Sequence, residues 1–166
     1  MKIIGIDPGS ARVGYGVVET AGKLTVLTCG TIEPEGVGGH ERLHSLKRNL
    51  ETLLRAWRPE KAGVERLFFG RNRKTALGVA ESRGVILETL AAHKIPVLEY
   101  APSEIKRAVA GDGNATKEGV GRMVRLTLGL RKIPGRDDAV DGLAIAITVA
   151  LMTRNTTSTG FKPESA

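Results

Sequence analysis

Apolar residues gather in three short runs in the first part of the chain. Residues 2–7, 12–20 and 24–32 are rich in valine, isoleucine and threonine, and glycine-bearing turns separate them. Runs of this kind are typical of β-strands, and their short connections indicate strands that follow one another as neighbours. The pattern therefore predicts a three-stranded meander at the start of the fold.

Beyond residue 40 the pattern takes on a helical period. Between residues 41 and 57, apolar side chains recur every three or four positions with charged residues between them, which predicts an amphipathic helix. The same periodicities predict two more strands and four more helices along the rest of the chain. These are strands at 61–68 and 96–100, and helices at 74–93, after Pro102, at 116–128 with Thr116 or Asn114 near its cap, and at 137–152.

A meander followed by alternating helices and strands predicts an α/β fold with a five-stranded mixed sheet flanked by helices. This order of elements resembles the ribonuclease H-like fold. The chain has 166 residues, the length of one ordinary domain. We expect residues 1–153 to form that single domain, and residues 154–166, which have nothing to bury, to be a disordered polar tail.

The charge of the chain suggests a partner. A net charge of +7 and a pI of about 9.9 favour a polyanion, with nucleic acid first, although charge alone does not establish binding. No apolar run is long enough to cross a membrane, and the N-terminus has an acid and a proline where a signal peptide would be apolar. A single cysteine, Cys29, agrees with a reducing compartment. We therefore expect a cytoplasmic protein.

Acidic residues interrupt apolar segments at several positions. Asp7 ends one predicted strand and Glu65 lies inside another. Neither is decisive alone, because Asp7 could begin an Asp-Pro-Gly turn and Glu65 could face solvent. In the last helix Asp138 and Asp141 share a face at a spacing of three, but Asp137 and Asp141 share one at a spacing of four. Spacing therefore leaves Asp137 and Asp138 as alternatives, and the helix dipole would favour Asp137 even without a catalytic role.

Several carboxylates brought together would need a cation between them. Two unit charges about 4 Å apart repel by about 4 kcal/mol at an effective dielectric constant of about 20. Mg²⁺ prefers carboxylate oxygens and also accepts phosphate as a ligand. The pair His40 and His44 has a spacing that zinc sites use, but no third ligand is close to it in the sequence. The pattern thus favours a magnesium site made of acids.

Three motifs resemble the RuvC family of Holliday-junction resolvases. They are IDPGS at 6–10 followed by GYG at 14–16, ERLF at 65–68, and DAVDGLAIA at 138–146. The likeness runs in order from residue 1 to about residue 152. It implies a metal-dependent endonuclease of the ribonuclease H-like fold that makes two symmetric nicks in four-way DNA junctions during recombination and repair.

The resemblance also implies a role for each acid. It makes Asp7, Glu65, Asp138 and Asp141 an acidic tetrad, and so assigns Asp138 rather than Asp137. The tetrad is implied to bind two Mg²⁺ ions, for which Mn²⁺ is the expected substitute. These ions would activate water for in-line attack on the phosphodiester and stabilise the leaving oxygen.

Basic and aromatic residues complete the site that the resemblance implies. Lys106 and Lys117 are expected to act near the scissile phosphate, and the sequence does not say which is closer. Either Phe68 or Phe69 should stack on an unpaired base at the crossover, while the other belongs to the core. The remaining expected DNA contacts are Ser10, Arg71, Arg73 and Lys74.

The implied partners are four-way junction DNA, a second copy of the chain and the RuvA–RuvB branch-migration complex. A homodimer suits this substrate because two identical sites can act on two equivalent strands. Two rival functions share part of the pattern. A nuclease of the same fold that acts on structured RNA shares the first motif, and the phosphate loop of actin-like or sugar-kinase ATPases resembles residues 5–10. Against the ATPase, the chain has about half the usual length and lacks a second phosphate loop.

Overall fold

Five strands and five helices make up the part of the chain that the computed structural model describes, which is residues 1–67, 73–135 and 137–158, with residues 73–75 and 155–158 described by their backbone alone. The strands are β1 (Lys2–Asp7), β2 (Val13–Ala21), β3 (Lys23–Ile32), β4 (Lys61–Glu65) and β5 (Val97–Tyr100). The helices are α1 (Gly39–Trp57), α2 (Arg73–Ala92), α3 (Pro102–Ala110), α4 (Lys117–Leu128) and α5 (Asp137–Ser158).

The strands form one mixed sheet in the order β3-β2-β1-β4-β5. Neighbours in the meander β1-β2-β3 are antiparallel, whereas β1 pairs with β4, and β4 with β5, in parallel. The predicted meander and five-stranded mixed sheet are therefore confirmed. In the central parallel pair, Gly5 of β1 lies opposite Gly63 of β4. This register brings the ends of the two strands, Asp7 and Glu65, to the same level in the sheet.

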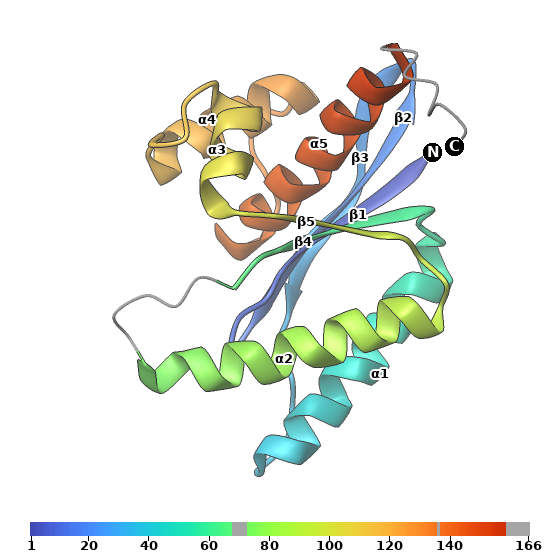
Figure 1. Ribbon diagram of the computed structural model, residues 1–166, viewed down its shortest axis with the longest axis vertical. Coiled ribbons are helices and arrows are strands. Elements are labelled where there is room, and N and C mark those ends of the chain that lie inside the picture. Colours follow the sequence, from blue (N-terminus) through green and yellow to red (C-terminus); the bar gives the residue numbers. More distant parts are fainter. Residues whose placement is uncertain (68–72, 136, 159–166) are drawn as a thin grey trace, which may run out of the picture.

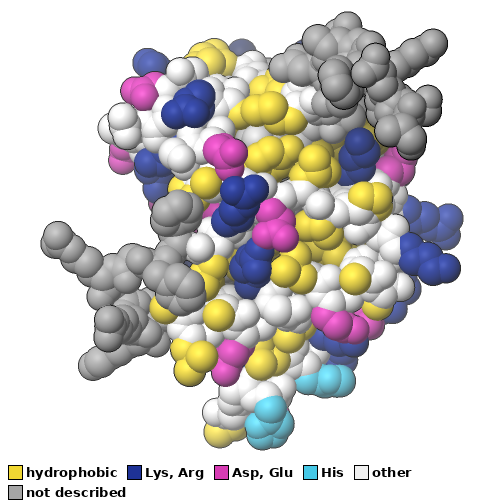
Figure 2. Space-filling view, in the orientation of Figure 1, with side chains coloured by type: hydrophobic (Ala, Val, Ile, Leu, Met, Phe, Trp, Pro, Cys, Tyr) yellow, Lys and Arg dark blue, Asp and Glu magenta, His cyan; other side chains and the backbone are white. Residues whose placement is uncertain are grey.

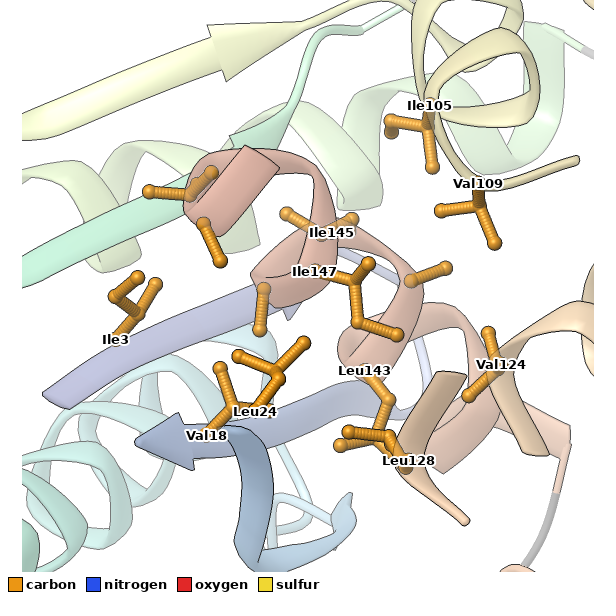
Figure 3. Packing of buried hydrophobic residues seen from close by; sticks show 14 of the residues in the cluster. Ile3, Val18, Leu24, Ile105, Val109, Val124, Leu128, Leu143, Ile145 and Ile147 are labelled. Atoms are coloured by element: carbon orange, nitrogen blue, oxygen red, sulfur yellow. The ribbon is translucent and has the colours of Figure 1, made fainter. Parts of the chain in front are cut away.

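Helices cover both faces of the sheet (Figure 1), with α1 and α2 on one side and α3, α4 and α5 on the other. Side chains of β1 alternate between the two layers, as in any strand. Ile4 and Ile6 are fully buried in the core beneath α1 and α2. Ile3 belongs to the opposite core, where it packs with Leu143, Ile145 and Ile147 of α5 (Figure 3). The sheet thus holds a core on each side.

Helix α5 lies directly on the sheet because glycines face it. A Cβ atom on Gly5 would lie 2.2 Å from the carbonyl oxygen of Gly142, and one on Gly16 would lie 2.7 Å from the amide nitrogen of Leu143. On the helix side, a Cβ atom on Gly142 would lie 2.4 Å from the carbonyl carbon of Tyr15. No side chain fits at these positions unless the backbone moves, so the glycines set how closely α5 approaches the sheet.

The start of α4 agrees with its predicted cap. Thr116 has extended backbone angles, and its hydroxyl oxygen accepts a hydrogen bond of 3.1 Å from the amide of Gly119. This is the contact that an N-terminal cap makes with the first turn of a helix. Thr116, rather than Asn114, therefore caps α4, and Lys117 becomes its first residue.

Two element boundaries differ from the predicted ones by three residues or more. Strand β4 ends at Glu65 instead of residue 68, because its partner β5 ends at Tyr100 opposite Glu65. The tail predicted from residue 154 is wrong for residues 154–158, because α5 continues to Ser158. Arg154 donates a hydrogen bond of 2.8 Å to the carbonyl oxygen of Gly22, which fastens this extension to the β2–β3 turn. Residues 159–166 lie outside the described residues.

None of the helices described is both long and apolar enough to span a bilayer.

Candidate active site

The carboxylates of Asp7 and Glu65 come from the ends of two adjacent parallel strands. Each acid is the last residue of its strand, two positions beyond the paired glycines Gly5 and Gly63. Side chains two positions apart point to the same face of a sheet. Since Cβ atoms on both glycines would meet α5, the two acids also lie on the α5 side of the sheet.

The first turns of α5 bring two further acids to this end of the sheet. Asp138 and Asp141 are both partly buried there. A Cβ atom on Gly14 would lie only 2.0 Å from the carbonyl oxygen of Asp138, so β2 runs directly against this turn. Asp137 is exposed and lines a different cleft. The position of the helix on the sheet therefore separates the two aspartates that spacing left as alternatives.

A pocket of about 330 Å³ collects most of these groups. Three of the four acids line it, together with two lysines from α3 and α4, while Asp138 lies outside its lining. Apolar residues of α3, α4 and α5 form the rest of the wall. The charged lining residues are Asp7, Glu65, Asp141, Lys106 and Lys117, and the apolar ones are Pro102, Ile105, Val120 and Ala144.

Asp138 and Asp141 each have a basic partner. The Nζ atom of Lys117 lies 3.1 Å from Oδ2 of Asp141, and the Nε atom of Arg12 lies 3.4 Å from Oδ2 of Asp138. Asp7 and Glu65 make no ion pair with any described residue. The two strand acids are thus the uncompensated members of the group.

Burial and mutual repulsion act on these uncompensated acids. Desolvation, followed by the charges of Glu65, Asp141 and Asp138, raises the pKa of Asp7 to about 8. Desolvation and the charge of Asp141 raise the pKa of Glu65 to about 7, although Lys106 acts in the opposite direction. Asp137 and Asp138 both act on Asp141, and of the two only Asp138 acts on Asp7. A bound cation would offset the repulsion between these carboxylates and lower their pKa values.

The carboxylate oxygens of the site suit a hard divalent metal, but in the structure they are too far apart to bind one ion together. Within residues 1–67, 73–135 and 137–158, no three Asp, Glu, His or Cys side chains lie close enough together to hold a metal ion as they stand. The oxygen-only donor set and the raised pKa of Asp7 nevertheless fit Mg²⁺ or Mn²⁺. The ion pairs of Arg12 and Lys117 hold the α5 carboxylates instead, so metal binding would have to exchange these contacts.

Replacing Asp7 by asparagine should stabilise the metal-free protein, and more so at high pH. The folded-state pKa of about 8 lies above the ordinary value of 3.8, so the contribution of Asp7 to stability is full below about pH 4 and is lost as the pH rises through 8. Asparagine removes this loss. At about 1.4 kcal/mol per pKa unit, we expect the Asp7→Asn gain in the free energy of unfolding to reach several kcal/mol at high pH.

Chemical denaturation with a chelator at pH 5 and pH 9 measures this gain. Glu81→Gln, at an exposed position of α2, is the control and should show little difference between the two pH values. An Asp7→Asn gain that did not increase with pH would contradict the raised pKa.

Several predicted DNA contacts lie elsewhere or cannot be placed. Ser10 is exposed and lines a separate pocket next to Arg42 and Gly78 rather than the acid pocket. The predicted contacts Phe68, Phe69 and Arg71 lie outside the described residues, and of Arg73 and Lys74 only the backbone at the start of α2 is described. Figure 2 shows basic and acidic side chains close together in the middle of the face it draws, so the net positive charge does not form one continuous patch there.

Arg12 is the site residue that the sequence did not indicate. It is held over α5 because it directly precedes β2, whose Gly14 packs against the Asp138 turn. Nothing in local spacing relates residue 12 to residue 138. Only the contact between β2 and α5 brings them together.

Comparisons with known proteins agree with this geometry. A family model described as crossover junction endodeoxyribonuclease RuvC matches residues 3–149. The crossover junction endodeoxyribonuclease RuvC of Syntrophomonas wolfei is 48% identical over 149 residues, which cover 89% of this chain and 87% of the relative.

Solved structures show the same likeness. Thermus thermophilus RuvC in complex with a Holliday junction substrate matches with a TM-score of 0.87 and 36% identity, over 95% of this chain and 97% of that one. A yeast mitochondrial Holliday junction resolvase, Ydc2, matches with a TM-score of 0.71 over 95% of this chain and 80% of that one. Its identity is 15%, so it supports the ribonuclease H-like fold alone.

Proposed function

Because this chain belongs to the RuvC family of crossover junction endodeoxyribonucleases, we propose that it resolves four-way DNA junctions by metal-dependent hydrolysis of two phosphodiester bonds. The observation that carries the proposal is the pocket in which acids from two parallel strands and α5 meet Lys106 and Lys117. Acids are suited to holding divalent metal, and lysines to holding the phosphate between metal and protein. This pairing is what hydrolysis of a phosphodiester needs.

The metal ligands in this proposal are Asp7, Glu65, Asp138 and Asp141. Two Mg²⁺ ions, with Mn²⁺ as substitute, would supply activation of water and stabilisation of the leaving oxygen when bound there. The chain itself positions the substrate. Apolar residues of α3 and α4 line the pocket and would limit the water around the reacting phosphate.

The two lysines differ in whether the ammonium group already has an ion-pair partner. Lys117 is held by Asp141, whereas Lys106 makes no ion pair with any residue that the structure describes. Lys106 is therefore the first contact for the scissile phosphate. Lys117 follows once its aspartate is engaged elsewhere, and it then neutralises charge that develops on the phosphate.

Paired nicking of a twofold substrate calls for a homodimer, in which each subunit presents the same site to one of two equivalent strands. The proposal includes this dimer, a cytoplasmic location and action together with the RuvA–RuvB branch-migration complex.

Cleavage of defined substrates tests the function. Purified protein with Mg²⁺ should nick a four-way junction at two symmetric positions and leave ends that ligase can seal, and a chelator should stop the reaction. Linear duplex of the same sequence and a structured RNA are the comparison substrates. Preferential cleavage of the RNA would favour the rival nuclease, and failure to cut the junction under any metal would refute the proposal.

Arg12 should compete with metal for Asp138. The Arg12–Asp138 ion pair is partly exposed, with 48% of the Arg12 side chain and 29% of the Asp138 side chain accessible. Its interaction free energy is therefore modest. Replacing Arg12 by glutamine removes a cation next to the acids and frees Asp138. We expect the variant to bind Mn²⁺ about twofold to fivefold more tightly in the absence of DNA.

Calorimetric titration with Mn²⁺ gives this affinity without any turnover. Arg48→Gln, which removes the same charge from an exposed position of α1, should leave the affinity unchanged. Weaker metal binding by Arg12→Gln would mean that Arg12 orients Asp138 for the metal instead of competing with it.

A further inference from the structure

A second cleft lies next to the acid pocket, along α4 and α5. It has a volume of about 370 Å³ and lies between the end of α4, the loop that follows it and the first turn of α5. Val140 lines this cleft, and the next residue, Asp141, lines the acid pocket. The two hollows therefore lie at successive turns of one helix.

The charged groups around this cleft are mostly basic. Arg125, Arg131 and Lys132 line it, and Asp137 is its one acid in the part of the chain described. None of the three basic side chains forms an ion pair with a described residue, unlike Arg66, which is paired with Glu104. The cleft thus carries positive charge that the fold itself does not neutralise.

The partial charge of a helix end adds to this field. Helix α5 begins at Asp137, so its first amide groups and the positive end of its dipole lie at the cleft. Asp137 offsets part of this effect. Three basic side chains together with a helix start nevertheless leave a site suited to an anion.

The distance from the acid pocket matches the spacing of a DNA strand. Lys117 begins α4 and Arg125 follows eight residues later, which corresponds to about 12 Å along the helix axis. A duplex carries one phosphate per strand about every 3.4 Å of its axis. A strand whose reactive phosphate lies at Lys117 and that continues along α4 would therefore bring a phosphate a few nucleotides away to Arg125.

We propose that this basic cleft, formed by Arg125, Arg131 and Lys132, binds the phosphate backbone of the duplex arm that leaves the cleavage site. This inference rests on the proposed function, because it takes DNA as the ligand. It adds a DNA contact outside the acid pocket. Arg131 and Lys132 are exposed and can reach the backbone, and Arg125 beside them is partly buried. Such contacts carry no sequence information, so the cleft sets the direction of the arm and not the choice of bases.

The test removes the two exposed charges and measures binding without chemistry. The double variant Arg131→Gln/Lys132→Gln is compared with Lys47→Gln/Arg48→Gln, which loses the same charge from α1 on the opposite face of the sheet. The control breaks the Lys47–Glu88 pair, but exposed pairs of this kind contribute little to stability. Affinity for a four-way junction and for a linear duplex with the sequence of one arm is measured in a chelator over a range of salt concentrations.

We expect the cleft variant to bind both DNAs roughly tenfold more weakly at low salt, with a slope of log affinity against log salt reduced by about 1.8, because each lost phosphate contact removes about 0.9. The cleavage rate of junction that is already saturated with enzyme should stay within about twofold of wild type, since the acids are untouched. The α1 control should keep the wild-type slope.

Two results would contradict DNA binding in the cleft. One is a wild-type salt slope in the cleft variant. The other is an equal loss of DNA affinity in the α1 control, which would show that net charge alone matters. Because the slope is also measured on linear duplex, it reports on the cleft independently of junction recognition. The preference of the wild-type protein for junction over duplex tests the proposed function separately.

Discussion

Asp141→Asn should reduce the rate of junction cleavage by about 10³-fold or more while the variant still binds the junction, since an amide leaves the shape of the pocket but removes a charged ligand. Asp141 lines the pocket between the strand acids and Lys117. Asp138→Asn should cause a loss of the same order, because the charge of Asp138 acts on Asp7. Single-turnover cleavage with saturating enzyme measures the chemical step, and gel shift in a chelator measures binding.

Asp137→Asn is the matched control for both substitutions. Asp137 belongs to the same turn of α5 and carries the same charge, but it is exposed and lines the basic cleft. The variant should cleave at close to the wild-type rate, and it should bind DNA slightly more tightly because an acid leaves that cleft. If Asp137→Asn lost as much activity as Asp138→Asn, the assignment of the tetrad would be wrong.

Gly5→Ala should destabilise the protein by roughly 3 kcal/mol or more, because the added methyl group meets backbone and not a movable side chain. Its Cβ atom would lie 2.2 Å from the carbonyl oxygen of Gly142 and 2.3 Å from the amide nitrogen of Ala146. Either β1 or α5 must move. The same movement would draw Asp141 away from Asp7, so any protein that still folds should also cleave slowly.

Two other glycines provide graded controls for this substitution. A Cβ atom on Gly63 would meet the side-chain methyl carbons of Val149 and Ile145 at 2.6 and 2.8 Å, which can move, so Gly63→Ala should cost less than Gly5→Ala. Gly39, the first residue of α1, has nothing within 4 Å, and Gly39→Ala should be neutral or slightly stabilising. Urea denaturation orders the three variants. A Gly5→Ala protein as stable as Gly39→Ala would show that α5 is not held as closely as described.

Local patterns predicted most of the fold because each depends on neighbours in the sequence. The meander, the amphipathic period of α1 and the cap of α4 follow from β-branched runs between turns, helical spacing and a capping hydroxyl within a few residues. The failures came where distant segments decide. Strand β4 stops where β5 stops, and α5 continues past residue 153 while Arg154 is tied to Gly22, 132 positions away.

The candidate site shows the same division. Asp7 and Glu65 could be proposed from strand ends that carry an unexpected acid, and Asp138 was favoured over Asp137 only through family resemblance. In the structure both aspartates act electrostatically on Asp141, but of the two only Asp138 acts on Asp7, and Asp137 lines the other cleft. The choice of Asp138 stays a prediction. It adds Arg12, for which no local signal exists.

Periodicity and side-chain chemistry are local properties, and they were enough to predict the elements, their order and the residue types able to bind metal and phosphate. They could not predict which acids lie near one another, which cations pair with them or where the basic cleft lies. These relations depend on the β1–β4 register and on the contact of α5 with glycines of β1 and β2. Both arise from pairing and packing between segments far apart in the chain, where no local pattern carries the information.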